Sequence, residues 1–513
     1  MLTDSHPRSI TARLEDALDN SVGGRRLTDF VGSLRHRVVP MHWTSVFGIV
    51  TMACVAVLFA TGLPLMFFYA PSSEQIVYHG SDATLQGIEM SKAYASTLGI
   101  SLDVGGGLLL RQAHHWAALL LPAAIIAQLL VAFFTGAFRR PRLWSWVLLF
   151  LILIAALAAG WSGYALPDDL LSGTGLRIVQ GIVLGIPVIG TWTSALLFGG
   201  DFPGQIIEHL YPIHLLVSAA VIALLAARIR SGWVQGPAQL PGAGRTEQNL
   251  VGVPILPTGA TRAAGLFAAV CGILILVSAT VTVSPVWRYG PSDPGNVSSG
   301  SQPDWYTGFL DGALRLVPSG WEVEFFGGTL TLAVLVPLVV VGLFLAAVVL
   351  YPFFEGLVTR DRTDHQVLDR PRNAPTRTAI GLAGMAFYGV LWGAASSDLI
   401  ATHFRLSLES VIAGFQVMVF AAPLVAFTVT RRVCLGLQRK DRELLLHGFE
   451  TGRIVRMPGG EYVEQHRPVD ADERLRLTDH SHHAPLVLRP DADGRLLLRE
   501  RARVALSRFL SPE

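Results

Sequence analysis

Two histidines, His114 and His214, are the residues whose type and placement best fit a chemical function in this sequence. Each lies near the start of a long apolar stretch, and His115 is the one other histidine clearly inside such a stretch. Ionisable side chains are rare in hydrocarbon because they need a partner there. Both stretches are predicted to cross a membrane in the same direction, so the two imidazoles lie at similar depth. Two facing imidazoles can bind one porphyrin iron between two helices.

A structural interpretation competes with haem ligation, because each histidine can instead hydrogen-bond a backbone carbonyl near a helix start. Three further residues favour a haem. Arg111 lies one turn before His114 on the same side of the helix and can pair with a haem propionate or anchor the helix at the interface. Gly48 and Gly62 are fourteen residues apart, so they recur on one helix face. Small residues there leave room for a flat macrocycle or for close helix packing.

The elements that must position these residues are predicted to be membrane-spanning helices. The chain has 513 residues, 51% of them hydrophobic and 15% charged, whereas soluble domains are about a quarter charged. A span needs roughly 20 apolar residues. Eight stretches qualify, at residues 44–69, 109–135, 144–164, 208–230, 263–286, 328–351, 378–397 and 411–430. We therefore expect an all-α, polytopic bundle of eight transmembrane helices.

The distribution of basic residues predicts how the chain is oriented in the membrane. Eight spans put both termini on one side, and the segments 1–43, 136–143, 231–262 and 353–377 on that side carry 16 Lys and Arg residues, against 5 in the opposite connections. Basic residues mark the cytoplasmic side. We therefore predict a multi-pass cell-membrane protein with both termini in the cytoplasm. Its parts are an N-terminal segment (1–43), a four-helix haem-binding bundle (44–230), four further spans (231–430) and a cytoplasmic tail (431–513).

Other kinds of site have little support. Cys54, Cys271 and Cys434 lie far apart without paired spacing, so neither a thiolate metal site nor a disulfide framework is indicated. The tail histidines, His480, His482 and His483, can bind a metal, but a solvated tail is favoured because no further ligands are spaced around them. The first 43 residues lack the apolar region of a signal peptide. The outer connection 165–207 has apolar and aromatic content typical of short helices on a membrane surface.

A second candidate site is the string Pro303-Asp304-Trp305-Tyr306, in a connection predicted to lie outside the membrane. A carboxylate such as that of Asp304 can accept a proton from a bound hydroxyl group. The competing interpretation is an aromatic belt at the membrane interface.

The chain resembles the cytochrome b subunits of actinobacterial cytochrome bc complexes, the menaquinol–cytochrome c reductases. The resemblance runs from about residue 40 to about residue 468. The strings that carry it, in the family's order, are RQAHHWAALL, FFTGAFRRPR, GYALPDDLLSGTGLRIVQG, GIPVIGTW, GGDFPG, PGAGRTEQN, GSQPDWY, LDRPRNAP and LQRKDRELLLHGFETGRIVRMPGGEYVE.

This resemblance implies haem b as the cofactor, with His114 and His214 as iron ligands. It also implies quinol oxidation at Pro303–Tyr306, which resembles the family's Pro-Glu-Trp-Tyr signature with Asp304 in the Glu position. Aspartate is one methylene shorter, so its reach differs. The partners implied are a Rieske iron–sulfur subunit, a cytochrome c subunit and menaquinol or another quinone, within a homodimer and without nucleic acid.

The sequence departs from the family at its second haem site. The family binds two haems with two histidines on each helix, about fourteen residues apart. Here Gln128 and Arg228 occupy the inner positions, about 21 Å further along each helix. Neither an amide nor a guanidinium is a normal iron ligand. We therefore expect the inner haem to be absent, so that electrons have no relay to a second quinone site.

Two nearby features fit this expectation. Arg228 is expected to extend to the cytoplasmic interface beside Arg230. Leu149 lies fourteen residues before Gly163, at a position where a glycine would leave room for a macrocycle.

Two functions from different classes remain open. The first is the cytochrome b subunit of a quinol–cytochrome c reductase, an oxidoreductase that works with the Rieske and cytochrome c subunits. The second is a paralogue with one haem or none that acts as a structural or regulatory membrane subunit, which Gln128 and Arg228 favour. A transporter has little support, because no pair of repeats with broken helices is visible.

Overall fold

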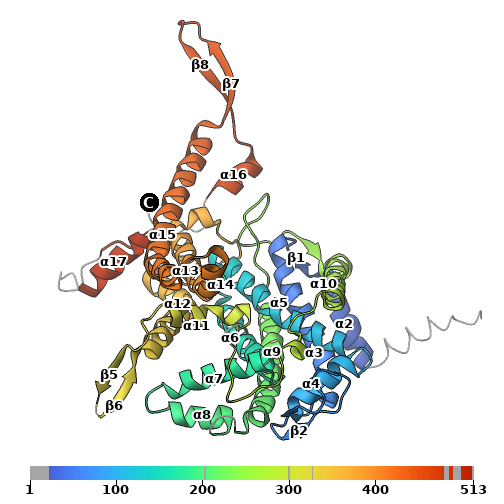
Figure 1. The fold of residues 1–513 in the computed structure, drawn as a ribbon. Coiled ribbons are helices and arrows are strands. Elements are labelled where there is room, and N and C mark those ends of the chain that lie inside the picture. Colours follow the sequence, from blue (N-terminus) through green and yellow to red (C-terminus); the bar gives the residue numbers. More distant parts are fainter. Residues whose placement is uncertain are drawn as a thin grey trace, which may run out of the picture.

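Long helices that run side by side make up most of the structure, a computed structural model that describes residues 22–200, 204–298, 301–325, 327–478, 485–488 and 498–510 (Figure 1). Seven of the described helices are long and apolar enough to span a membrane. They are α3 (Val46–Phe68), α5 (Gly107–Phe134), α6 (Leu143–Ala165), α9 (Ile206–Gln235), α10 (Ala260–Thr280), α12 (Leu332–Thr359) and α15 (Leu408–His447). The pair α13 (Pro375–Ala394) and α14 (Ser397–Phe404) forms an eighth span if it counts as one.

The predicted all-α membrane bundle is confirmed, and each of the eight predicted spans corresponds to a helix. The differences lie at the ends. The span predicted at 378–397 is followed by a bend of 64° between α13 and α14. The last span continues as one helix to His447. Hydropathy marks where a helix leaves the hydrocarbon, but it does not mark where the helix itself ends.

The first half of the bundle is built from α3, α5, α6 and α9. α3 packs against α5 and α6 packs against α9, while α10 covers α3 and α5. Large apolar side chains from all of these helices form one buried cluster, which includes Cys54, Ile125, Leu149, Leu225 and Leu274.

The second half is built from α12, α13 and α15, with the short helix α11 (Gly308–Arg315) beside them. α13 packs against α15 and also against α11. Their shared core contains Phe309, Ala313, Val341 and Leu391. Gly312 permits this packing, because a β-carbon there would lie only 2.7 Å from the carbonyl carbon of Leu391.

Short elements connect the spans. The helices are α2 (Val22–His36), α4 (Lys92–Leu102), α7 (Leu170–Leu184), α8 (Gly190–Phe198), α16 (Ala471–Leu477) and α17 (Leu498–Leu510). The strands form antiparallel pairs: β1 (Val38–Val39) with β4 (Val253–Pro254), β2 (Gln75–Val77) with β3 (Glu89–Ser91), β5 (Glu322–Phe325) with β6 (Gly328–Thr331), and β7 (Phe449–Arg456) with β8 (Tyr462–Arg467). Helices α7 and α8 confirm that the connection 165–207 contains short helices.

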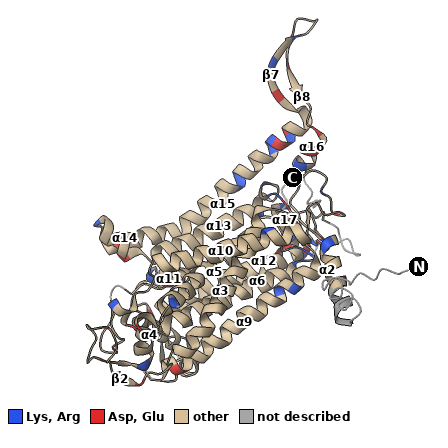
Figure 2. Ribbon diagram, turned by 90° about the vertical axis from the view of Figure 1, so that its right-hand side faces the viewer, with Lys and Arg blue, Asp and Glu red and all other residues tan. Residues whose placement is uncertain are grey.

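Charged residues gather at the two ends of the bundle and are sparse along its middle (Figure 2). We call one end the basic end; it carries α2, α17 and the links 135–142, 236–254 and 360–374. The other, the histidine end, carries α4, α11 and α14. The β7–β8 hairpin projects beyond the basic end on the extension of α15 (Figure 1).

A buried ion network joins the two halves at the basic end. Asp369 lies 2.8 Å from Arg139 and 2.7 Å from Arg377, and Arg377 lies 2.6 Å from Glu355. Burial alone would raise the pKa of Asp369, but the two guanidinium groups outweigh burial and lower it. The network therefore fixes the link 135–142 against α12 and α13.

Candidate functional site

His114 and His214 face each other between α5 and α9. Each lies about two turns from the histidine end of its helix. Their ring centres are 6.4 Å apart, and their planes are inclined at 62°. The structure therefore brings together the two histidines that the sequence singled out, although they are 100 residues apart in the chain.

Hydrogen bonds at Nδ1 orient both rings. The hydroxyl of Thr61 donates to the carbonyl of Val57 at 2.7 Å, which leaves its oxygen to accept from His114 Nδ1 at 3.0 Å. His214 Nδ1 lies 3.0 Å from the carbonyl oxygen of Ala159, so it must donate there. With the proton on Nδ1, each Nε2 keeps a lone pair. This is the arrangement of metal-binding histidines, whose second nitrogen is held by an outer partner.

Glycines on the flanking helices make room for the two rings. A β-carbon at Gly62 of α3 would lie 3.0 Å from His114 Cε1, and one at Gly163 of α6 would lie 2.8 Å from His214 Cε1. Either contact would push the imidazole out of place. Gly62 was predicted from its spacing. Gly163 was noted only because it lies fourteen residues after Leu149.

A cavity of about 460 Å³ lies at the histidine pair. Its lining is mainly apolar and comes from α3, α5, α6 and α9. The polar residues at its wall include His114, His115, His214, Arg111, Asp304 and Tyr306. The predicted haem ligands and part of the predicted quinol motif therefore share one cavity.

The residues present fit a haem. Two metal–imidazole bonds of about 2 Å, with about 1 Å from each nitrogen to its ring centre, place the ring centres roughly 6 Å apart. The observed 6.4 Å matches this span. The free Nε2 lone pairs, the two glycines and the apolar cavity supply the donors and the space that a bis-histidine haem needs.

Arg111 also lies at the cavity wall, but protein groups already hold it. Its Nε donates to Ser101 Oγ at 3.1 Å, and Nη2 donates to the carbonyl of Ser284 at 2.9 Å. It therefore ties α5 to α4 and to the segment after α10. Pairing with a haem propionate, which the sequence left open, would have to use the remaining nitrogen, Nη1.

The Pro303–Tyr306 string forms the turn that leads into α11, at the histidine end. Tyr306 is 1% exposed, and its hydroxyl donates to Asp304 Oδ2 at 2.8 Å. Trp305 Nε1 donates to the carbonyl of Leu119 in α5 at 3.1 Å, and Trp392 Nε1 donates to the Trp305 carbonyl at 3.0 Å. The motif is thus held between the two halves of the bundle.

The sequence did not assign a partner to His115. Its Nε2 lies 3.4 Å from Asp304 Oδ2 and is buried without a geometrically good hydrogen bond among the described residues. Adjacent residues on a helix point about 100° apart. His114 therefore faces His214, while His115 faces Asp304. The adjacent pair His114-His115 was the sequence signal for this second contact, but it could be used only if the Pro303–Tyr306 motif was known to lie nearby.

The position of Gln128, fourteen residues beyond His114, has different surroundings. Its amide nitrogen donates to Thr51 Oγ1 at 2.7 Å, and it lies within 3.3 Å of the Phe47 carbonyl oxygen. A β-carbon at Gly48 would lie 3.8 Å from Gln128 Oε1. Gly48 therefore adjoins Gln128 as Gly62 adjoins His114, but the polar side chain is already bonded within the protein.

Arg228 lies partly buried on α9, fourteen residues beyond His214. Its Nε is fully buried, and no described residue accepts a hydrogen bond from it. Arg230 is exposed. The expectation that Arg228 extends to the interface beside Arg230 is untested, but the burial of its Nε shows that protein covers the base of the guanidinium.

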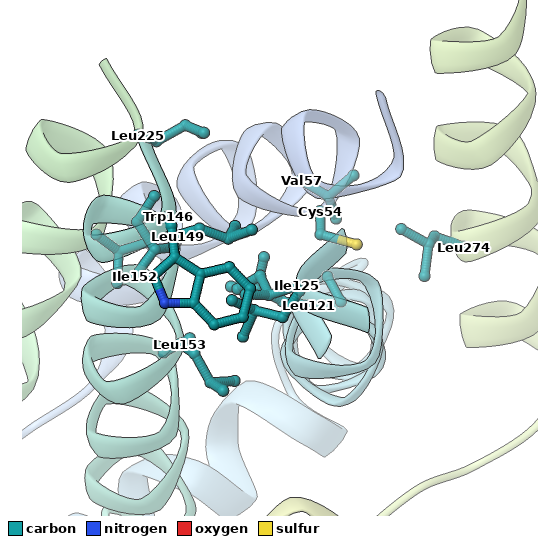
Figure 3. Packing of buried hydrophobic residues seen from close by; sticks show 14 of the residues in the cluster. Cys54, Val57, Leu121, Ile125, Trp146, Leu149, Ile152, Leu153, Leu225 and Leu274 are labelled. Carbon is teal, nitrogen blue, oxygen red and sulfur yellow. The ribbon is translucent and has the colours of Figure 1, made fainter. Parts of the chain in front are cut away.

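Packed apolar side chains fill the bundle between the histidines and the basic end (Figure 3). Leu149 is 2% exposed, Ile125 is fully buried, and Leu225 and Val221 complete the contact from α9. Leu149 occupies the position on α6 that corresponds to Gly163. Near the histidine end, Gly163 therefore leaves space beside the ring of His214. Near the basic end, Leu149 fills the corresponding space on α6.

Two acidic residues, Asp168 and Asp169, lie outside the spans in the turn between α6 and α7. Burial raises the pKa of Asp168 to about 6. Burial also raises the pKa of Asp169, whose carboxylate accepts from the backbone of Leu171 and Ser172 as the N-cap of α7. The tail histidines proposed as metal ligands lie outside the described residues.

Comparisons with known proteins give a consistent result. The family described as cytochrome b (N-terminal)/b6/petB matches residues 119–291. A cytochrome bc1 complex cytochrome b subunit of Streptomyces coelicolor is 45% identical over 459 residues, which cover 89% of this chain and 84% of that protein. One from Mycobacterium tuberculosis is 46% identical over 455 residues, covering 88% and 81%. A solved chain described as hyperthermophilic respiratory Complex III has the same fold, with a TM-score of 0.60 and 17% identity over 82% of this chain and 99% of that one.

Proposed function

The chain belongs to the cytochrome b subunits of cytochrome bc1 complexes, and from this premise we propose that it oxidises a quinol at the histidine end and holds one haem b instead of two. Membership of this family makes the chain a multi-pass membrane subunit of a quinol–cytochrome c reductase. The number of haems, the site residues and the activity are the proposed parts.

His114 and His214 would hold the haem iron through their Nε2 atoms. The observation that carries this assignment is the 6.4 Å separation of two rings whose Nδ1 atoms are already engaged. Haem b supplies a one-electron acceptor when bound. The chain's contribution is to fix the ligand tautomer and to keep water out with an apolar wall.

Asp304 would accept a proton from the quinol hydroxyl. Tyr306 donates to Oδ2 and orients the carboxylate toward the shared cavity. His115 lies on its other side at 3.4 Å. A carboxylate held between two polar groups at the wall of an apolar cavity has the surroundings that a general base needs.

The second haem site would be lost. Gln128 is bonded to Thr51, Arg228 offers no lone pair, and Leu149 is packed where a macrocycle would need space. Without residues to hold a second haem, the chain would offer no electron relay between the His114–His214 pair and the basic end. The chain would therefore not run a cycle that returns electrons to a second quinone site.

The remaining features follow from the family and from charge. The basic end would face the cytoplasm, because its connections carry most of the Lys and Arg residues. A Rieske iron–sulfur subunit and a cytochrome c subunit would receive the electrons, menaquinol would be the substrate, and the complex would be a homodimer.

Counting haem tests the proposal. A pyridine haemochrome assay on the purified chain should give one haem b per polypeptide, and His214→Ala should remove it. Two haems per chain would overturn the single-haem proposal, and a fully haem-free protein would overturn the ligand assignment.

The paired replacements at Gln128 and Arg228 also favour a second candidate, a structural or regulatory paralogue within the complex. Quinol-dependent reduction of the haem in the assembled complex discriminates between the two. A single-haem enzyme reduces its haem when quinol is added, whereas a structural subunit does not.

A further inference from the structure

Arg228 is a partly buried cation without an anion among the described residues. Its Nε is fully buried, and no described residue accepts a hydrogen bond from it. Arginine stays protonated in proteins. A charge in this position needs a partner, because hydrocarbon does not solvate it.

The other buried arginines of the basic end differ from Arg228 in this respect. Arg139 and Arg377 share Asp369, and Arg377 also binds Glu355. Arg142 donates to Gln366 Oε1 at 3.2 Å and to the His365 carbonyl. Arg139 Nη1 and Arg142 Nε are also buried without a hydrogen-bond partner, but each of these three side chains has at least one acceptor, whereas Arg228 has none among the described residues.

The surrounding helices offer no carboxylate. Helices α3, α5, α6 and α10 contain no Asp or Glu, and α9 contains none after Glu208. The next acidic residue along the chain, Glu247, accepts instead from the backbone nitrogens of Gln366 and Val367. Asp29 on α2 is exposed. The missing anion must therefore come from outside the described chain.

The neighbouring residues place this cation near a membrane surface. Trp233, 41% exposed, lies five residues after Arg228, about 7 Å along the helix axis. Exposed tryptophans of membrane helices sit at the level of lipid headgroups. Arg37, at the end of α2, lies 4.1 Å from the Trp233 ring centre, and Arg230 is exposed beside it. These side chains add positive charge and no negative charge.

A hydrogen-bond acceptor lies on the same face of the helix. Gln235 is two turns beyond Arg228, and its Oε1 is buried without a partner among the described residues. Residues seven apart lie on one side of an α-helix. The face therefore presents an unpaired cationic donor and, nearer the membrane surface, an unpaired neutral acceptor.

We propose that Arg228 binds the phosphate group of an anionic phospholipid at the basic end of the bundle. Basic pockets between transmembrane helices bind such headgroups, and a guanidinium pairs with phosphate through parallel hydrogen bonds. Gln235 Oε1 accepts from a headgroup hydroxyl, which favours phosphatidylglycerol or phosphatidylinositol over headgroups without one. This site does not depend on the proposed electron-transfer function.

The test compares lipid binding by full-length protein purified in detergent and stripped of lipid. Bound lipid is counted by native mass spectrometry, and the thermal midpoint is followed with added phosphatidylglycerol, phosphatidylcholine or inorganic phosphate. Arg228→Gln removes the charge, and Arg230→Gln is the matched control on the same helix. Wild type and Arg230→Gln should bind phosphatidylglycerol about tenfold more tightly than Arg228→Gln, the loss expected for one charge-assisted pair.

Other outcomes overturn the proposal. Equal binding by all three proteins would show that Arg228 is not the ligand. Equal stabilisation of wild type by phosphatidylglycerol and phosphatidylcholine would show that the site does not select an anionic headgroup. This comparison needs no variant. If inorganic phosphate raises the thermal midpoint as much as phosphatidylglycerol does, the site binds free phosphate and not a lipid. Unchanged haem content in Arg228→Gln keeps these results separate from the haem proposal.

Discussion

The side-chain amide of Gln128 donates a 2.7 Å hydrogen bond to Thr51 Oγ1, joining α5 to α3 at the position where the family resemblance leads us to expect a haem-binding histidine. Its counterpart near the histidine end is the 3.0 Å contact between His114 and Thr61, which also joins α5 to α3. In one case the bond orients a ligand toward a cavity. In the other it lies beside packed apolar side chains, so we expect that restoring a histidine alone does not restore a haem site.

The first prediction concerns that closed core. The double variant Gln128→His with Arg228→His should still contain one haem, because Leu149 remains packed between the helices. Adding Leu149→Gly opens about the volume of a leucine side chain and should allow a second haem to bind. Haem per polypeptide, by pyridine haemochrome, measures both. A second haem in the double variant would show that the ligands, and not the packing, exclude it.

The second prediction concerns the proton acceptor at the quinol motif. In the assembled complex, Asp304→Asn should lower the rate of quinol oxidation by roughly 10²–10⁴, the usual contribution of a general base. Tyr306→Phe removes only one hydrogen bond to that carboxylate and should lower the rate less. Asp304→Glu restores the family's residue and should retain activity.

Haem content provides the control for these variants, since none of them touches His114 or His214. It should stay at the wild-type value. If Asp304→Asn oxidises quinol at the wild-type rate with its haem in place, another group accepts the proton.

The helices and the histidine pair could be predicted from sequence because both follow from local rules. Apolar runs of bilayer length identify the spans, and two histidines at equal depth predict a shared site. The bend between α13 and α14 could not be found in this way. Hydropathy ends the span at residue 397, but it does not show that a second short helix follows at 64° to α13.

The site was harder to predict where it depends on contacts between distant segments. His115 and Asp304 are 189 residues apart, and only the packing of the Pro303–Tyr306 turn against α5 brings them together. The sequence likewise identified the ion-pair residues of the basic end only as positive charge. Their carboxylates, Asp369 and Glu355, come from later segments of the chain.

The third prediction concerns this ion network. Arg377→Met leaves Glu355 and Asp369 buried beside one fewer cation, and breaking a buried pair costs about 3–5 kcal/mol. Arg360→Gln breaks an exposed contact with Glu500 and should cost less than about 1 kcal/mol. Unfolding midpoints in one detergent compare the two. Similar small losses would mean that water already solvates the network.

The last prediction concerns Asp168, whose pKa is raised by burial from its ordinary 3.8 to about 6. The folded state therefore disfavours the carboxylate, a penalty that is absent below about pH 4 and complete above about pH 6, on the order of 3 kcal/mol. Its backbone φ of 54° suits asparagine equally well. Asp168→Asn should thus raise the thermal midpoint at pH 8 and change it little at pH 4. Asp293→Asn, at an exposed aspartate, should leave the pH dependence unchanged. A stabilisation by Asp168→Asn that is the same at both pH values would mean that its charge is not the cause.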